Sequence, residues 1–398
     1  MTRVEGGKRV DVAIVGGGLA GASCAIELAR AGFEVALFEK KEYPRHKMCG
    51  EFLSAEGRTL LQSLGLDDEL QSVGPAEITG LRLTDASGGE CRAILPDSAI
   101  GISRYVLDAL VMNRARATGV LVHEGSAVTK IDGSLRDGFE VVTRGGEAAG
   151  DTRGATPGDI PGDTWHARVV IGAWGRSSTL DRTVRPDVNV DSPWVAFKAH
   201  FEGEMPGVVE LHAFNGGYCG VGPIESRGFV KRVNVCWIMH RDRIPDQTLD
   251  RFDAMLKDVL SENPLLADRL ATLRRIWDKP VSASQLFFSP TTPFAADVCL
   301  IGDAAGMIAP LFGDGMTMAL TSGVYAAGEA GRFLRSETSA TAFVARYSRT
   351  WKRAFWRRMM LGQISHATLS NPRRARLVVV IGGWSPGVIR RVAGLMRR

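Results

Sequence analysis

The stretch that decides the fold runs from Val10 to Lys40 and reads VDVAIVGGGLAGASCAIELARAGFEVALFEK. Its β-forming apolar residues at 10–15 predict a buried strand, the small and apolar residues at 19–30 predict a helix, and residues 35–38 predict a second strand. Two strands and a helix of this length form one right-handed βαβ unit with parallel strands. The unit therefore predicts an α/β architecture.

The turn between the first strand and the helix carries Gly16, Gly18 and Gly21 in the spacing G-x-G-x-x-G. The first glycine allows the tight turn, the second lets a pyrophosphate approach the backbone, and the third lets the helix pack closely on the strand. Glu39 ends the second strand, where a carboxylate can accept hydrogen bonds from ribose hydroxyls. Because the glycines stand between a strand and a helix, and the acid follows about 20 residues later, the sequence predicts a dinucleotide site.

The size and composition are those of a globular protein with two or three domains. The chain has 398 residues, of which 45% are hydrophobic and 23% are charged. The net charge of +5 is unevenly spread, because residues 341–398 contain 13 Lys and Arg and no Asp or Glu. The sequence therefore predicts an acidic to neutral body with a basic C-terminal segment.

The six cysteines lie far apart and show no C-x-x-C pair or metal-ligand spacing. We therefore expect reduced thiols, no metal site and a cytoplasmic protein. The N-terminus enters the first strand without an apolar signal region, and no apolar run approaches 18 residues. We expect no membrane span.

A basic loop with Lys40, Arg45 and Lys47 follows Glu39. Arg45 or Lys47 could contact phosphates, and a solvated basic loop explains both cations equally well. Cys49 precedes Gly50, and a glycine there suggests a backbone that approaches a bound group closely. Cys49 is therefore a candidate catalytic residue that faces the cofactor, with a structural cysteine as the alternative.

Residues 76–96 alternate around a Ser-Gly-Gly turn and predict a β-hairpin. Residues 194–240 are β-like throughout, which predicts an antiparallel sheet in a second domain. His200 and His212 on these strands are candidate acid–base residues, although a lone histidine on a strand is usually structural. A helix is expected over 249–273.

Two further features concern the cofactor site and the surface. Ser103 predicts the N-cap of a helix whose first turn holds Arg104, where a cation is disfavoured unless it meets an anion. An exposed arginine is the alternative interpretation. The stretch 144–163 is rich in Gly, Asp, Thr and Pro, which predicts a mobile hairpin tip.

A second motif follows a last strand at 298–301 and reads Gly302-Asp303-Ala304-Ala305-Gly306. Asp303 comes just after a strand end, at the edge of the sheet where the first glycine turn lies, so its carboxylate can hold sugar or ribityl hydroxyls. The amides of residues 313–316 lie at the start of a long helix and can donate to a carbonyl oxygen. Such a helix dipole would stabilise an anionic reduced isoalloxazine.

These motifs, in this order over residues 8 to about 335, resemble the FAD proteins of the aromatic-hydroxylase, geranylgeranyl-reductase and flavin-halogenase superfamily. The resemblance implies a p-hydroxybenzoate-hydroxylase-like fold. This fold has a discontinuous Rossmann-like FAD-binding domain of the three-layer ββα type, an antiparallel-sheet substrate domain and a C-terminal helical segment. We expect the FAD-binding domain at 1–75, 99–185 and 281–335, the substrate domain at 76–98 and 186–280, and the basic helical segment at 336–398.

The resemblance also implies FAD as the cofactor, with NAD(P)H or a separate flavin reductase as the electron source. It implies that Glu39 contacts the adenosine ribose, the Val128 backbone contacts the adenine, Asp303 contacts the ribityl chain, and the Gly315 and Met316 amides contact the isoalloxazine. The cofactor-binding residues that we expect are Gly16, Gly18, Ala20, Gly21, Glu39, Lys40, Arg45, Arg104, Val128, Gly302, Asp303, Pro310, Gly313, Gly315 and Met316.

Within the superfamily, Cys49-Gly50-Glu51 and Gly306 are more similar to the geranylgeranyl-reductase branch. Trp174-Gly175 replaces the Asp-Gly pair that aromatic hydroxylases usually carry for flavin and NAD(P)H, which puts direct NAD(P)H binding in doubt, although Arg176 and Ser177 still fit. The W-x-W-x-I-P motif of halogenases is missing. Ile78 and Thr79 stand where their reactive lysine is expected.

Two reactions remain. We favour a monooxygenase that acts on a hydrophobic aromatic or polyketide-like biosynthetic intermediate, free or carrier-bound. The alternative is a flavin-dependent reductase of C=C bonds in an isoprenoid or lipid, for which Cys49 could supply a proton. We rank halogenation and non-enzymatic prenyl binding below both. The substrate prediction depends on aromatic residues of the second domain, which core packing explains equally well: Phe197, Phe201, Phe214, Tyr218 and Trp237.

Residues 351–360 and 388–398 look like basic amphipathic helices. They predict either a C-terminal cap packed on the pocket or a peripheral contact with anionic lipid or an acidic carrier protein. No nucleic-acid recognition motif accompanies the basic charge, so we expect no nucleic-acid partner.

Overall fold

A computed structural model describes residues 7–145, 161–176, 179–186, 191–244, 251–288 and 292–384. The predicted βαβ unit is present as β1 (Lys8–Val15), α1 (Leu19–Arg30) and β2 (Val35–Glu39). β1 pairs in parallel with β2 and with β9 (Pro161–Gly172), so it lies at the centre of the first sheet. Its apolar residues, among them Val12 and Ile14, are fully buried.

The first sheet has eight strands in the described part of the chain, and six of them run in the order β16-β17-β9-β1-β2-β6. The strands added to the βαβ unit and β9 are β6 (Leu121–Glu124), β7 (Ala127–Ser134), β8 (Gly138–Arg144), β16 (Phe294–Ala295) and β17 (Val298–Leu300). α1 packs against α4 (Arg104–Ala117) and α8 (Asp314–Leu334), and β7 and β8 extend the sheet from β9. Shorter helices of this half are α2 (Ala55–Ser63), α3 (Asp67–Val73) and α5 (Thr179–Val184).

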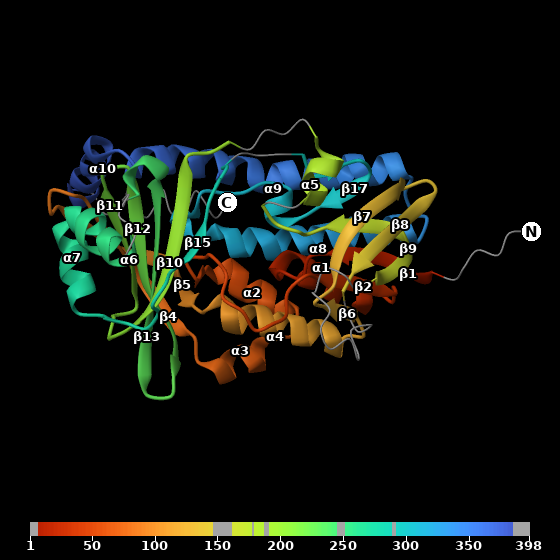
Figure 1. Ribbon diagram of the computed structural model, residues 1–398, viewed down its shortest axis with the longest axis horizontal. Helices are drawn as coiled ribbons and strands as arrows, with labels where there is room; N and C mark the ends of the chain where they lie inside the picture. Colours follow the sequence, from red (N-terminus) through yellow and green to blue (C-terminus); the bar gives the residue numbers. More distant parts are fainter. Residues whose placement is uncertain are drawn as a thin grey trace, which may run out of the picture.

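The second sheet lies at the other end of the molecule (Figure 1). Its strands run in the order β14-β10-β13-β12-β11-β4-β5-β3, with β15 paired to β10. Their bounds are β3 (Phe52–Leu53), β4 (Ala76–Thr84), β5 (Glu90–Gly101), β10 (Trp194–Glu202), β11 (Val208–Phe214), β12 (Gly217–Arg227), β13 (Val230–His240), β14 (Arg274–Arg275) and β15 (Val281–Ala283). The predicted hairpin is β4–β5.

Two expectations about this half need correction. The sheet is not wholly antiparallel, because β4 arrives from an earlier part of the chain and pairs in parallel with β11. The helix expected over 249–273 is interrupted: α6 (Arg251–Ala254), the π-turn Met255–Val259 and a 3₁₀ turn precede α7 (Pro264–Ala271). The break falls at Asn263, because the residue before a proline disfavours the helical conformation, and the Asn263 side chain caps α7 instead.

The two faces of the second sheet pack against different partners. One face meets α6, the π-turn and α7, and its core includes Phe197, Phe201, Phe214 and Trp237. The other face meets α10 (Pro372–Trp384) and the loop around Leu311. Four of the five aromatic residues expected in the substrate pocket therefore belong to the core behind the sheet.

The C-terminal helices α9 (Ala340–Leu369) and α10 lie along one edge of the molecule (Figure 1). Phe343, Tyr347, Trp351 and Phe355 of α9 join the core of the first sheet. In the described residues, no helix is both long and apolar enough to cross a membrane. The predicted hairpin tip at 144–163 falls mostly outside the described residues, as do the predicted helix at 388–398 and Ser177.

Candidate functional site

A groove of about 510 Å³ runs along the carboxyl ends of the first sheet toward the second sheet. Glu39 and Asp303 both line it, together with Arg104 and residues of the predicted glycine turn. The expected cofactor residues in its lining are Gly16, Gly18, Ala20, Glu39, Lys40, Arg45, Arg104, Val128, Gly302, Asp303, Pro310, Gly313, Gly315 and Met316. Gly21 is buried beneath the turn.

The three glycines of the turn differ in what surrounds them. Gly16 has φ +110, and a Cβ built there would lie 2.3 Å from the carbonyl oxygen of Ala173. A Cβ on Gly21 would lie 2.0 Å from the carbonyl oxygen of Gly16. At Gly18 the nearest atom is Lys47 Nζ at 3.8 Å, so open space remains there. The first and third glycines thus serve chain packing, and the second leaves room for a phosphate.

Glu39 is only 5% exposed, and its carboxylate accepts three hydrogen bonds. The Gly17 amide lies 3.0 Å from Oε2, the Lys41 amide lies 3.0 Å from Oε1, and Arg45 Nη2 lies 3.3 Å from Oε1. A carboxylate has about four acceptor positions, so ribose hydroxyls can still be accepted here. The Arg45 Nε atom is buried and has no hydrogen-bond partner among the described residues, which fits a ligand that is bound nearby.

A compact charge cluster lies next to the glycine turn. Asp108, one helical turn after Arg104, accepts hydrogen bonds from the Arg104 guanidinium and from Lys47 Nζ, the latter at 2.6 Å. These two cations hold the pKa of the buried Asp108 carboxyl down at about 2. One carboxylate thus faces two cations, and the net positive charge suits a pyrophosphate. Lys47 also donates to Tyr43 Oη.

The second motif also supplies part of the groove wall. Gly302 has φ +60 and Gly313 has φ +69, conformations that favour glycine. Gly302 and Asp303 follow β17, while Gly313 immediately precedes α8, so Gly315 and Met316 lie in the first turn of that helix. Backbone amides at a helix N-terminus attract an electron-rich group. Trp174 lines the groove as well, and its Nε1 donates to Asp181 at 3.1 Å.

A smaller cavity of about 70 Å³ adjoins the groove. Both share Gly50, Phe52, Pro310 and Gly313 in their linings. The remaining walls are mostly apolar: Leu81, Leu95, Val209, Leu211, Gly220, Val221, Gly222 and Leu311, and Asp314 is the one ionisable residue among the described residues that line the cavity. This cavity lies between the second sheet and the start of α8, where a substrate could meet a cofactor bound in the groove.

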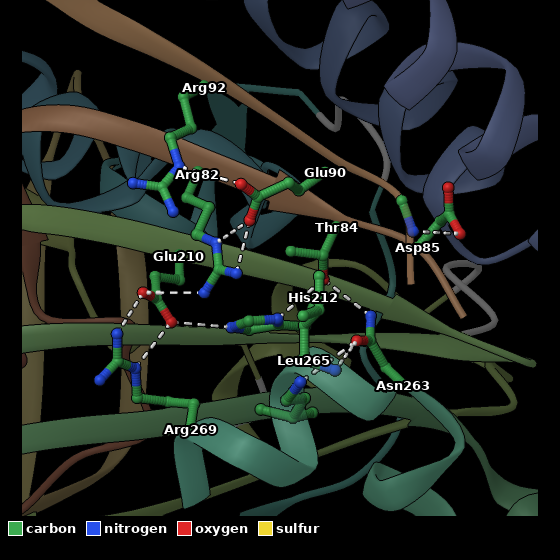
Figure 2. A network of polar contacts seen from close by, with 12 residues as sticks. Arg82, Thr84, Asp85, Glu90, Arg92, Glu210, His212, Asn263, Leu265 and Arg269 are labelled. Carbon is green, nitrogen blue, oxygen red and sulfur yellow. Dashed lines mark hydrogen bonds and ion pairs between the residues drawn. The ribbon is translucent and has the colours of Figure 1, made fainter. Parts of the chain in front are cut away.

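The three candidate catalytic residues occupy different places. Cys49 lines the groove, and the Glu51 amide donates to its Sγ at 3.4 Å. His200 is fully buried behind Glu51, which lines the groove, and its Nε2 lies 2.7 Å from Glu51 Oε2. His212 belongs to the opposite side of the second sheet (Figure 2), where it bonds Thr84 Oγ1 at 2.8 Å and Glu210 Oε2 at 3.1 Å. His212 lines neither cavity.

The groove is therefore suited to an FAD. It provides two carboxylates, Glu39 and Asp303, a glycine turn with open space at Gly18, adjacent cations, and a helix N-terminus. The features define a flavoprotein with a p-hydroxybenzoate-hydroxylase-like fold. The FAD binding domain family model matches residues 9–360, and the chain belongs to that family. FAD is its cofactor.

Curated relatives within this superfamily carry several activities. The flavin-dependent halogenase armH3 of Armillaria mellea is 26% identical over 361 residues, which is 84% of this chain and 70% of that protein. Digeranylgeranylglycerophospholipid reductase 2 of Methanopyrus kandleri is 26% identical, over 87% of this chain and 83% of that protein. Menaquinone reductase of Mycobacterium tuberculosis is 28% identical, over 80% of this chain and 75% of that protein.

Solved structures show the same fold. The myxobacterial chondrochloren halogenase CndH superposes with a TM-score of 0.76 at 20% identity, covering 98% of this chain and 96% of that one. PqsL of Pseudomonas aeruginosa, crystallised with 2-aminobenzoylacetate, superposes with a TM-score of 0.70 at 18% identity, covering 98% and 100%. The chain is thus an FAD-dependent oxidoreductase by family, and relatives with different reactions share its fold.

Several groove residues were absent from the predicted set. The sequence presents Lys47 only as an alternative to Arg45 for contacting phosphates, whereas in the structure its Nζ lies 3.8 Å from a Cβ built on Gly18. Glu51, Trp174 and Arg176 also line the groove. Spacing could have pointed to Asp108, because an acid four residues after Arg104 lies on the same helix face. The partnership of Glu51 with Lys198 and His200 joins distant segments and has no local signal.

Proposed function

We propose that this protein is an FAD-dependent monooxygenase that acts on a compact, apolar aromatic or polyketide-like group. The observation that carries this proposal is the apolar cavity that shares a wall with the cofactor groove. A cavity of about 70 Å³ is smaller than the ~150 Å³ that encloses benzene. It therefore suits the edge of one ring better than a long isoprenoid chain.

Bound FAD supplies the redox chemistry, in which two electrons from NAD(P)H or a separate reductase allow one oxygen atom to enter the substrate and the other to form water. The protein's own part is binding, orientation and exclusion of water. Leu81, Leu95 and Leu211 keep the cavity wall apolar, while the shared loops at Gly50 and Gly313 let a substrate approach the groove closely. Asp314 at the start of α8 is placed to accept or return a proton at the cavity edge.

Reduction of a C=C bond is the second candidate. Cys49 supports it, because a thiol that lines the groove could give a proton to the carbon next to the one that receives hydride. The reductases named among the relatives also favour it. Halogenation has less support, since no lysine stands among the residues that line the apolar cavity in the described chain.

Anaerobic stopped-flow separates these reactions. The oxidised holoenzyme is mixed with NADPH or NADH, or reduced by a flavin reductase, and then with oxygen in the presence of a panel of phenols and enones. The monooxygenase proposal expects oxygen to reoxidise the flavin within seconds and ¹⁸O₂ to label a phenolic product. If the reduced flavin does not react with oxygen but is oxidised by an enone, the protein is a reductase and the monooxygenase proposal is wrong. If a product forms only when bromide is present, the protein is a halogenase.

We further propose that α9 and α10 dock on an anionic lipid surface that presents the hydrophobic substrate. Large apolar side chains are exposed on one side of each helix: Trp356, Met360 and Ile364 on α9, and Leu377, Val380, Ile381 and Trp384 on α10. Exposed cations accompany them: Lys352, Arg353, Arg357, Arg373, Arg374 and Arg376. Apolar side chains flanked by arginines are typical of helices that lie in a membrane interface.

The position of α10 supports this docking. Its buried residues Ala375 and Val379 pack in a core that includes Leu311 and borders Leu95, and both leucines line the apolar cavity. A lipid surface against α10 would therefore lie close to the cavity. An acidic carrier protein is the competing partner, but the exposed apolar side chains would add little to the affinity for such a protein. One relative, a brominase of Pseudoalteromonas luteoviolacea, is named for a peptidyl-carrier-protein substrate.

A further inference from the structure

Side chains of the second sheet hold the loop that separates the cofactor groove from the apolar cavity. The Glu51 carboxylate accepts hydrogen bonds from Lys198 Nζ and from the Arg104 amide, the latter at 2.7 Å. Its other oxygen lies 2.7 Å from His200 Nε2. Glu51 is 1% exposed, and Lys198 and His200 are fully buried. A buried charge is stable only when it is paired and hydrogen-bonded, as it is here.

The same sheet grips the loop at two more points. Lys198 Nζ also donates to the Lys47 carbonyl oxygen at 3.1 Å, and Asn234 Nδ2 donates to the Cys49 carbonyl oxygen at 3.2 Å. The loop from Lys47 to Glu51 is therefore attached to β10 and β13 through its backbone as well as through the Glu51 side chain. Residues 47–52 also line the groove.

The backbone of Glu51 shows why this attachment matters. Glu51 has φ 57, in the left-handed region that residues other than glycine rarely adopt. Such a conformation persists where the surroundings determine it strongly. Its neighbours Gly50 and Phe52 line both cavities, so the position of this loop sets the wall between cofactor and substrate.

We propose that Glu51 is a positioning residue, whose contacts with Lys198 and His200 fix the 47–52 loop in the shape that binds FAD. The proposal depends on FAD binding and is independent of which reaction follows. The competing explanation is that the ion pair only stabilises the folded chain. Glu210 provides a matched control for that explanation.

Glu210 forms a second buried charge network in the same sheet (Figure 2). Side chains alternate along a strand, and Phe197, Phe201 and Phe214 pack in one core. Glu210 therefore shares the face of Phe214, whereas Lys198 and His200 lie on the opposite face. Glu210 is 2% exposed, pairs with His212, and accepts from Arg269 Nη2 at 2.8 Å and Nε at 3.0 Å. The cationic and hydrogen-bonding partners lower the pKa of both Glu51 and Glu210 to about 2. Glu210 lines neither cavity, so its loss should affect stability without affecting the cofactor site.

The test compares Glu51→Gln with Glu210→Gln. Each apoprotein is titrated with FAD, and the dissociation constant is read from quenching of flavin fluorescence. The visible absorbance of the bound flavin and the melting temperature of the apoprotein are also measured. We expect both variants to melt at lower temperature, and only E51Q to bind FAD about tenfold or more weakly with an altered flavin spectrum.

Wild-type FAD affinity and spectrum in a folded E51Q would overturn the proposal, and so would equal weakening in E51Q and E210Q. If E51Q does not fold, Asn234→Leu replaces it, since this neutral change removes only the bond to the Cys49 carbonyl. We expect N234L to weaken FAD binding several-fold, and an unchanged affinity there would equally overturn the proposal. Because the measured quantity is FAD binding, failure of the monooxygenase assignment would leave these results unaffected.

Discussion

Glu39 and Asp303, which belong to distant segments of the chain, line one continuous groove. Glu39 ends β2 and Asp303 follows β17, and both strands run parallel to the central pair β1 and β9. Parallel strands bring their carboxyl ends to one edge, where α/β sheets bind ligands. The relationship explains how two motifs so far apart can hold one extended cofactor.

The first prediction concerns these two carboxylates. Glu39→Ala and Asp303→Ala should each weaken FAD binding about tenfold or more, because each loses a charge-assisted acceptor for a sugar or ribityl hydroxyl. Fluorescence titration of the apoproteins measures the effect. Glu34→Ala, an exposed acid just before β2, should bind FAD as the wild type does. Unchanged affinity in both D303A and E39A would contradict the groove as the FAD site.

The glycine turn gives a prediction that separates stability from binding. Gly21→Ala should lower the melting temperature of the apoprotein, since its Cβ would lie 2.0 Å from the Gly16 carbonyl oxygen and would push α1 away from the turn. Gly18→Ala should leave the apoprotein stable, because among the described residues, apart from its neighbours in the chain, only Lys47 Nζ lies within 4 Å of its Cβ. It should nevertheless weaken FAD binding strongly, because the methyl group occupies the space for the pyrophosphate. A G18A protein that binds FAD normally would place the phosphates elsewhere.

Local patterns explain how much of this site could be predicted. Glu39 ends a strand, and the glycine turn and the motif around Asp303 each come just after one, so strand order alone brings them to one edge. The pairing of Glu51 with Lys198 and His200 could not be predicted, because it depends on how the second sheet packs against the loop from Lys47 to Phe52. The same limit applies to the aromatic residues: alternation along a strand shows that Phe197 and Trp237 are buried, but it does not show on which face the cofactor lies.

Asp108 should balance the phosphate-facing cations in the absence of cofactor. Asp108→Asn leaves Arg104 and Lys47 without their shared counter-charge, which should destabilise the apoprotein by about 3–5 kcal/mol, as expected when one partner of a buried pair is removed. Bound FAD supplies negative charge from its pyrophosphate. We therefore expect FAD to raise the melting temperature of D108N by more than it raises that of the wild type.

Asp68→Asn, which changes an exposed aspartate of α3, is the matched control and should behave as the wild type. If FAD stabilises D108N less than the wild type, then Asp108 holds the cations in place for the pyrophosphate instead of neutralising them.

A pH prediction follows from His366, which is buried among aromatic rings of Trp194, Tyr218 and Phe288. Burial lowers its pKa from 6.5 to about 4. Because the folded-state pKa lies below the unfolded value, the unfolded chain takes up a proton between pH 6.5 and 4 that the folded chain refuses. The free energy of unfolding should therefore fall by about 3 kcal/mol across this window from His366 alone.

Urea unfolding of the apoprotein at pH 7 and pH 4.5 measures this loss. His366→Gln should show a shallower fall in the urea midpoint than the wild type. Parallel pH profiles for H366Q and the wild type would show that His366 remains accessible to protons in the folded state.

The C-terminal helices provide the last prediction. Full-length holoenzyme should sediment with vesicles that contain about 30% phosphatidylglycerol and should release as salt rises, since exposed arginines attract anionic headgroups. Trp356→Ser combined with Ile364→Ser should reduce the bound fraction several-fold, because burial of apolar side chains supplies the salt-independent part of the affinity.

Phe229→Ser is the control, since Phe229 is fully exposed on the β12–β13 hairpin, away from α9 and α10. Equal binding by F229S and by the α9 double variant would show that these helices are not the contact. If the wild type does not bind vesicles but forms a salt-sensitive complex with an acidic carrier protein, the same surface is the docking site of the carrier. The double variant also tests for self-association. If the wild type is a dimer, the double variant is a monomer and neither binds vesicles, then the exposed side chains of α9 pack against those of a second copy of the chain.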